Sequence, residues 1–306
     1  MWHSPACRPG CTTQIQSDTG PARRRTAADL VLADGVAGGP DVLSLVLTVP
    51  PTYEGVTAMA QVLEEGDIFF CYRPAVDADR VRGLADVQRF FVIVKPRKKP
   101  VFRRLVIGRK HLPSAEEHER TWAVVDLVTS HSEEIEDDLD PAGYETRTRG
   151  RRQVQAARPA GEGVYAVASH NGHTHLVYAL ELPERLGPVQ LELNINPEAS
   201  LVATVRNPDL PAPTRPGIPP SRDANYPDTL RQRFTSRRFT ELDPPEFLDF
   251  PGAELVPIGA STDTGRELDL PLRPQRETAE SAGIFTVLGM ERDLHPVRPL
   301  FTGEWA

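Results

Sequence analysis

The chain has 306 residues, enough for one large domain or two of ordinary size, and 39% of them are apolar. Its 30 prolines predict long irregular connections, because proline cannot donate a hydrogen bond inside a helix or a sheet. The formal net charge of −8 argues against a protein that coats nucleic acid or anionic membrane nonspecifically, but it leaves room for a local basic site.

Cysteine content and hydropathy bear on location. The three cysteines (Cys7, Cys11 and Cys71) are odd in number and too few for the disulfide framework of a small secreted protein. No segment approaches the roughly 18 consecutive apolar residues of a membrane-spanning helix. We therefore expect a cytoplasmic protein without membrane contact.

The first half of the chain predicts a flexible tail followed by a β-rich core. Residues 1–40 are rich in Gly, Pro, Ser, Thr and Arg without periodicity, which is typical of a flexible N-terminal tail. The core is expected to cover 41–206. In its first part, apolar runs predict strands at 43–49, 68–72, 87–94, 105–108 and 122–129. Helical spacing predicts a helix at 53–64, the capping-box spacing of Ser114 and Glu117 a short helix just after Ser114, and acids in the N-terminal turn a helix at 132–139.

The second half continues with strands and then becomes irregular. Strands are expected at 164–168, 176–182, 201–205 and 254–258, and short helices at 188–195, 228–234 and 244–248. Residues 207–227 contain seven prolines and are expected to form a linker or surface loop. Residues 228–306 are expected to pack on the core as a C-terminal segment.

Two stretches of the core are similar in pattern. Residues 66–113 and 163–211 each contain a strand after a glycine, a strand ending at a proline, and a Leu-Val strand followed by an arginine and a Leu-Pro pair. An internal duplication is one explanation and coincidence is the other, because the spacings differ. The predicted fold class is α+β: a mainly antiparallel twisted sheet or barrel with a few short helices.

Residues 164–182 give the clearest local prediction. Asn171 and Gly172 stand between two alternating apolar runs, and both residue types adopt the positive φ angles of a two-residue hairpin turn. That turn fixes the register and places Tyr165 opposite Tyr178 on one face. Three histidines then project from the other face: His170, His173 and His175.

Three imidazoles on one face can hold zinc, iron or another divalent transition metal, with an open position for an activated water. This pattern predicts a metal-dependent, hydrolytic enzyme. The alternative is a solvated hairpin tip, since no carboxylate is placed nearby as a general base. The sequence contains no Gly-rich phosphate loop, G-x-S-x-G, Cys-x-x-Cys or H-E-x-x-H motif that would name a reaction.

Residues 95–110 are a basic segment without acids, adjoined by phenylalanines. Such a strand edge can contact phosphate or a single nucleic-acid strand. The alternative is that the arginines face the acidic helix at 132–139 of the same molecule. The candidate phosphate-binding cations are Lys95, Arg97, Lys98, Lys99, Arg103, Arg104, Arg109 and Lys110.

Four stretches resemble an uncharacterised bacterial protein family: EGDIFFCYRP (65–74), DVQRFF (86–91), RRLVIGRKHLP (103–113) and GHTHLVYALELP (172–183). That family has no established activity, so the resemblance implies no catalytic residue, cofactor or partner. The leading functional prediction is a cytoplasmic binding or regulatory protein with an unknown partner. The metal-dependent enzyme and the nucleic-acid or phosphate binder are the two alternatives.

Overall fold

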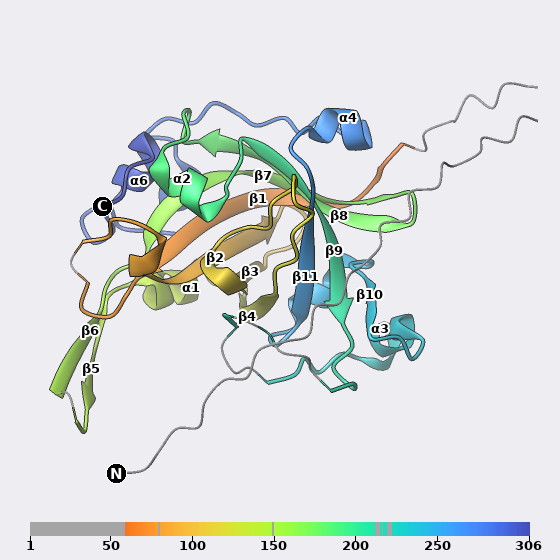
Figure 1. Ribbon diagram of the computed structural model, residues 1–306, viewed down its shortest axis with the longest axis horizontal. Coiled ribbons are helices and arrows are strands. Elements are labelled where there is room, and N and C mark those ends of the chain that lie inside the picture. Colours follow the sequence, from red (N-terminus) through yellow and green to blue (C-terminus); the bar gives the residue numbers. More distant parts are fainter. Residues whose placement is uncertain (1–58, 79, 149, 212–214, 216, 219–221) are drawn as a thin grey trace, which may run out of the picture. The chain divides into compact units, whose positions relative to one another are not determined.

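The computed structural model describes residues 59–78, 80–148, 150–211, 215, 217–218 and 222–306 (Figure 1). The predicted tail at 1–40 and the predicted strand at 43–49 lie outside these residues. None of the helices in the described part of the chain has the length and apolar character needed to cross a membrane.

The main sheet of the described residues is antiparallel and has nine strands. Four consecutive strands form a meander in the first half: β1 (Gln61–Pro74), β2 (Val87–Pro96), β3 (Phe102–Ile107) and β4 (Ala123–Thr129). Four strands form a second meander: β7 (Arg158–His170), β8 (His173–Leu182), β9 (Glu198–Arg206) and β11 (Glu254–Ser261). β1 pairs with β7, and β4 pairs with β11, so these strands close into a barrel. The short β10 (Phe239–Glu241) pairs with the end of β9.

Short helices lie in the connections, as predicted. The α-helices are α1 (Ser132–Leu139), α2 (Pro188–Leu193), α3 (Asp228–Arg231), α4 (Thr264–Leu268), α5 (Gly283–Thr286) and α6 (Arg298–Thr302). The 3-10 helices are η1 (Leu84–Asp86), η2 (Gly108–Lys110), η3 (Gln232–Phe234) and η4 (Pro245–Asp249). A separate two-stranded ribbon consists of β5 (Ala142–Thr146) and β6 (Gly150–Val154). The predicted α+β class with a mainly antiparallel sheet is confirmed.

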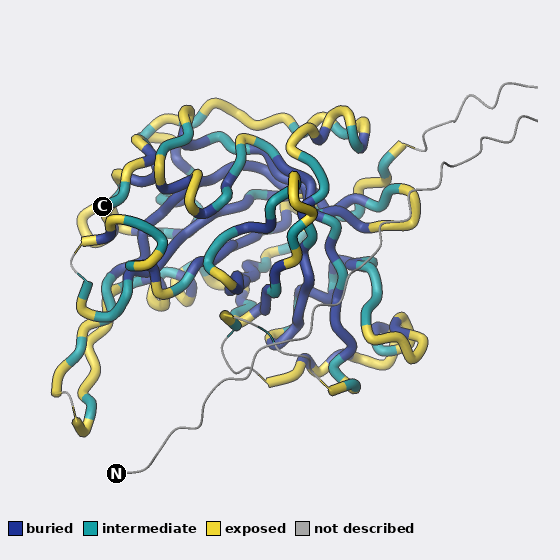
Figure 2. The backbone as a smooth tube through the Cα atoms, in the orientation of Figure 1, coloured by how far each residue is buried: buried dark blue, intermediate teal, exposed yellow. Residues whose placement is uncertain are grey.

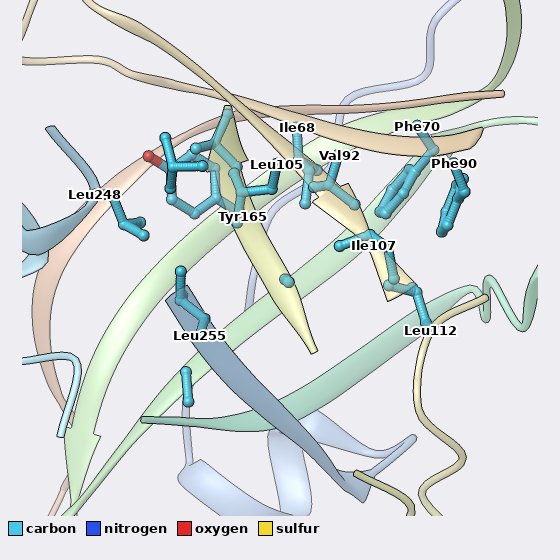
Figure 3. Packing of buried hydrophobic residues seen from close by; sticks show 14 of the residues in the cluster. Ile68, Phe70, Phe90, Val92, Leu105, Ile107, Leu112, Tyr165, Leu248 and Leu255 are labelled. Carbon is cyan, nitrogen blue, oxygen red and sulfur yellow. The ribbon is translucent and has the colours of Figure 1, made fainter. Parts of the chain in front are cut away.

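Side chains fill the inside of the barrel. Alternate residues of each strand point inward, and Ile68, Phe70 and Val92 are among them (Figure 3). An apolar cavity of only about 30 Å³ remains among these side chains, so the interior is a packed core and not a ligand chamber. The opposite face of β1 to β4 is also buried, under α1, α5, α6 and the chain near them. Runs such as FFCY and FFVIV are therefore continuously apolar, because both of their faces are covered.

The two meanders match in register as well as in strand order. Leu63 is an extra residue in β1 where it pairs with β7, and Ala160 is an extra residue in β7 where it pairs with β1. Asp126 is an extra residue in β4 against β3, and Ala260 is an extra residue in β11 against β9. When β1 is matched to β7 so that Leu63 lies on Ala160, the strand registers also bring Asp126 of β4 onto Ala260 of β11. The halves are thus related by an approximate two-fold rotation that exchanges the two ends of the barrel.

Two glycines occupy equivalent places in this arrangement. A Cβ atom at Gly66 would lie 2.1 Å from the carbonyl oxygen of Lys95, and one at Gly163 would lie 2.1 Å from that of Ala179. Each glycine opens its predicted block, and Lys95 and Ala179 are equivalent residues of β2 and β8. The match in bulges and glycines favours an internal duplication over coincidence and extends each copy by a fourth strand.

The helix predicted after Ser114 is wrong, and so is the described end of the one predicted at 53–64. Residues 61–64, the described end of the helix predicted at 53–64, form the start of β1. The bulge at Leu63 interrupts the strand alternation, so the apolar residues imitate helical spacing. After Ser114 the chain forms a turn instead of a helix, although the backbone N–H of Glu117 does donate to the Ser114 hydroxyl (3.3 Å). His118, at a φ of 46°, ends that turn.

Candidate functional site

One end of the barrel contains a buried network of charged side chains. Arg103 lies on β3 at an inward-facing position, and its side chain is fully buried. Its Nη1 and Nη2 atoms donate to the two carboxylate oxygens of Glu64 on β1 (2.6 and 3.0 Å). Its Nε atom donates to Asp249 of η4 (2.7 Å). One guanidinium therefore joins two strands of the barrel to the helix that covers this end.

Three further side chains extend the network. The Tyr165 hydroxyl, from β7, donates to Glu64 (2.9 Å), and burial together with the Glu64 charge raises the pKa of Tyr165 well above its usual value. Lys99, from the β2–β3 turn, lies 2.6 Å from Glu246 and 3.5 Å from Asp249. We call this end of the barrel the charged end; its residues are Glu64, Lys99, Arg103, Tyr165, Glu246 and Asp249.

A hollow of about 330 Å³ lies against the charged end. Its volume falls in the range of small-molecule sites, which combine apolar walls with a few convergent polar groups. Its lining has that composition: Val62, Leu63, Pro96 and Pro245 are apolar, and Glu64, Glu65, Lys98, Lys99 and Glu246 are charged.

At the other end of the barrel, the positions equivalent to this network carry no charges. The approximate two-fold places Gly161 at the position of Glu64, Ala199 at that of Arg103, and Ile68 at that of Tyr165. All three are buried, and Val189 of α2 belongs to the same apolar cluster. Arg158, which pairs with Tyr72 across β7 and β1, is a buried charge at that end. Removing charges from water costs several kcal/mol per ion. A network retained at that cost, when the equivalent positions of the same chain are uncharged, points to function.

The predicted basic segment at 95–110 does not form one surface. Successive side chains of a strand point to opposite faces, so Arg103 lies inside the barrel and Arg104 outside. Arg104 makes a bidentate pair with Asp126 (3.0 and 2.9 Å) and also contacts Asp138 of α1, so it does face the acidic helix.

The remaining cations of this segment are dispersed. Lys95 lies over the Phe102 ring, at 5.7 Å from its centroid. Arg97 is 4.0 Å from Asp67, and Arg109 is 3.2 Å from Glu119. Lys98 and Lys99 line the hollow, and Lys110 ends η2. The structure brings Lys98, Lys99 and Arg103 together at the charged end and separates the others.

The predicted histidine hairpin is confirmed in its turn and register. Asn171 and Gly172 reverse the chain at φ angles of 50° and 81°. His170 pairs with His173, and Ala168 pairs with His175. The tyrosine face points into the barrel, so the histidines lie on the outside.

The three histidines have different surroundings. The rings of His170 and His175 lie 6.3 Å apart, and Nδ1 of His175 is 2.9 Å from the buried Ser200 hydroxyl and 3.8 Å from Glu267 of α4. His173 is exposed and lies 3.8 Å from Glu241. In the part of the chain that the structure describes, no group of three or more His, Cys, Asp or Glu side chains is arranged to hold a metal ion. The metal site therefore remains a prediction without geometric support.

His175 gives a prediction about pH. Burial, and then the neighbouring His170 and His173, lower its pKa to about 4. Between pH 6.5 and pH 4, His175 takes up a proton in the unfolded chain but stays neutral in the folded protein. The free energy of unfolding therefore falls as the pH falls, by up to about 3 kcal/mol in total.

We expect His175→Phe, which copies the equivalent Phe91, to flatten this decline in urea-unfolding measurements between pH 6.5 and pH 4. The same substitution at the exposed His131 is the control. Parallel curves for His175→Phe and the unsubstituted protein would refute the assignment.

A second hollow, of about 370 Å³, lies outside the barrel beside α1 and includes Arg73 and Arg104. Arg73 donates to the backbone carbonyls of Asp140 (3.1 Å) and Gln155 (2.8 Å), and so stabilises the C-terminal end of α1. The two-fold relates Arg73 to His170 and Arg104 to Ser200. The cleft in the first half and the histidine hairpin in the second half therefore occupy equivalent positions. The cleft presents arginines there, and the hairpin presents histidines.

Sequence reasoning missed Glu64, Tyr165 and Asp249 as members of a site. Arg103 could have indicated the site, because a charged residue at an inward position of an alternating strand requires a buried partner of opposite charge. A comparison with protein-family models, with curated proteins and with solved structures finds no match.

Proposed function

We propose that this protein binds a small zwitterionic molecule in the hollow at the charged end of the barrel. The observation that carries the proposal is the retention of a buried ionic network at one end when the equivalent positions of the other end are apolar. Such a role agrees with the sequence-based prediction of a binding or regulatory protein.

The unpaired groups of the hollow indicate the ligand's chemistry. Arg103 is already paired with the carboxylates of Glu64 and Asp249. Lys99 is paired with Glu246 and Asp249. Glu65 and Lys98 line the same hollow, and neither side chain has an ion pair among the described residues. One free carboxylate and one free ammonium complement a ligand that carries both an amine and an acid. The apolar walls suit an aliphatic group, so a free amino acid with an aliphatic side chain is the simplest candidate.

The experiment is a thermal-shift series on the full-length protein with each standard amino acid as the probe. A ligand that binds only the folded state raises the free energy of unfolding by about 2.7 kcal/mol at one hundred times its Kd. We expect an aliphatic amino acid to raise the Tm and Lys98→Ala to abolish that shift.

Lys110→Ala is the matched control, because Lys110 lies outside the hollow and should keep the full response. If every amino acid leaves the Tm unchanged, or if Lys98→Ala responds like the unsubstituted protein, the proposal fails.

The other sequence-based predictions stay predictions. A metal-dependent hydrolase would require a rearranged histidine hairpin. A phosphate site at 95–110 would compete with the carboxylates that Arg97, Lys99, Arg103, Arg104 and Arg109 now contact. The cytoplasmic location is compatible with an amino-acid sensor and is tested by cell fractionation.

A further inference from the structure

The β5–β6 ribbon projects from the body of the molecule (Figure 1) and is exposed along almost its whole length (Figure 2). It arises between α1 and β7, in the connection between the two halves of the barrel. An isolated two-stranded hairpin is marginal in stability, and this one adds little to the core. Its presence therefore calls for a role at the surface.

The ribbon is basic in an acidic chain. Residues 142–154 contain four arginines and a single acid, whereas the whole chain has a net charge of −8. The arginines are Arg147, Arg149, Arg151 and Arg152, of which Arg149 lies outside the described residues. Arg147 and Arg151 are exposed and have no carboxylate partner among the described residues, in contrast to Arg103 and Arg104.

The base of the ribbon is fixed to the barrel by Asp77. The backbone N–H of Gln153 donates to the Asp77 carboxylate (2.9 Å), and the backbone N–H of Asp77 donates to the Gln153 carbonyl (3.0 Å). Arg152 pairs with the same carboxylate (2.8 Å). These contacts hold the base and leave Arg147 and Arg151 free to meet a partner.

We propose that the β5–β6 ribbon is an arm that binds the major groove of double-stranded DNA. That groove is about 12 Å wide and admits a two-stranded ribbon. Five-residue strands span about 17 Å, which is enough to carry arginines to phosphates on both sides of the groove. The half-exposed Tyr144, which pairs with Arg152 across the ribbon, adds an aromatic surface. Double-stranded RNA is a poorer fit, because its major groove is deep and narrow.

The test is fluorescence anisotropy of a labelled DNA duplex, with the full-length protein, over a series of salt concentrations. Because the body of the protein is acidic, we expect micromolar affinity at low salt. The double variant Arg147→Ser/Arg151→Ser should weaken binding at least about tenfold and reduce the slope of log Kd against log salt by about two, one for each phosphate that is no longer neutralised. The charge-conserving Arg147→Lys/Arg151→Lys should retain most of the affinity.

The matched control is Arg185→Ser/Arg276→Ser, which removes the same charge from exposed positions off the ribbon. It should bind as the unsubstituted protein does, and an RNA duplex should bind more weakly than DNA. The proposal is overturned if the protein does not bind DNA at low salt, if the ribbon variant binds unchanged, if the control loses as much affinity as the ribbon variant, or if RNA binds as tightly as DNA. An unchanged Tm and circular dichroism spectrum show that the variants are folded.

Discussion

Arg103→Met is expected to lower the free energy of unfolding by about 3 to 5 kcal/mol, because it leaves two carboxylates without their buried cation. Glu64 and Asp249 have side-chain exposures of 9% and 26%, so water cannot fully replace the guanidinium. The Tyr165–Glu64 hydrogen bond alone cannot compensate the remaining charge. Urea unfolding at neutral pH measures the loss.

The control for this variant is Arg109→Met. Arg109 also pairs with a carboxylate, that of Glu119 at 3.2 Å, but its side chain is 54% exposed. A pair of this kind contributes less than about 1 kcal/mol. If Arg103→Met loses no more stability than Arg109→Met, the network at the charged end contributes no more to the free energy of unfolding than an exposed ion pair does.

Gly66→Ala and Gly163→Ala are expected to have similarly large effects for one shared reason. In each case the new methyl group would meet a backbone carbonyl of the neighbouring strand at 2.1 Å, so the strands must separate. We expect each substitution to cost about 3 kcal/mol or more, or to prevent folding.

Gly143→Ala, on the exposed ribbon, is the matched control, since a Cβ there meets nothing closer than the Arg151 side chain at 3.7 Å. It should change stability by less than about 1 kcal/mol. A clear difference between Gly66→Ala and Gly163→Ala would show that the two positions are not equivalent and would weaken the two-fold relation between the halves.

The fold could be predicted from the sequence where the local signal was strong. The Asn171-Gly172 turn and helix α1 occur where the sequence predicts them, because turn chemistry and acids in the first turn of a helix act within a few residues. The ribbon at 142–154 was missed because its strands are polar on both faces and carry no alternation.

The charged end could not be predicted, since it depends on distant parts of the chain. Glu64 and Arg103 meet only because β1, β2 and β3 are neighbours in the barrel, and Asp249 comes from η4, far along the chain. The bulge at Leu63 concealed the strand that carries Glu64. The basic segment shows the same limit, because a cluster in the sequence is divided between the inside and the outside of a strand.

The most direct test of the account asks whether the charged end serves the fold or a ligand. The quadruple variant Glu64→Met/Arg103→Met/Tyr165→Phe/Asp249→Leu replaces the network by apolar side chains of similar volume. We predict that its urea-unfolding midpoint equals or exceeds that of the unsubstituted protein, while Arg103→Met alone is strongly destabilised. A quadruple variant as unstable as the single one would contradict the claim that the network is kept for binding.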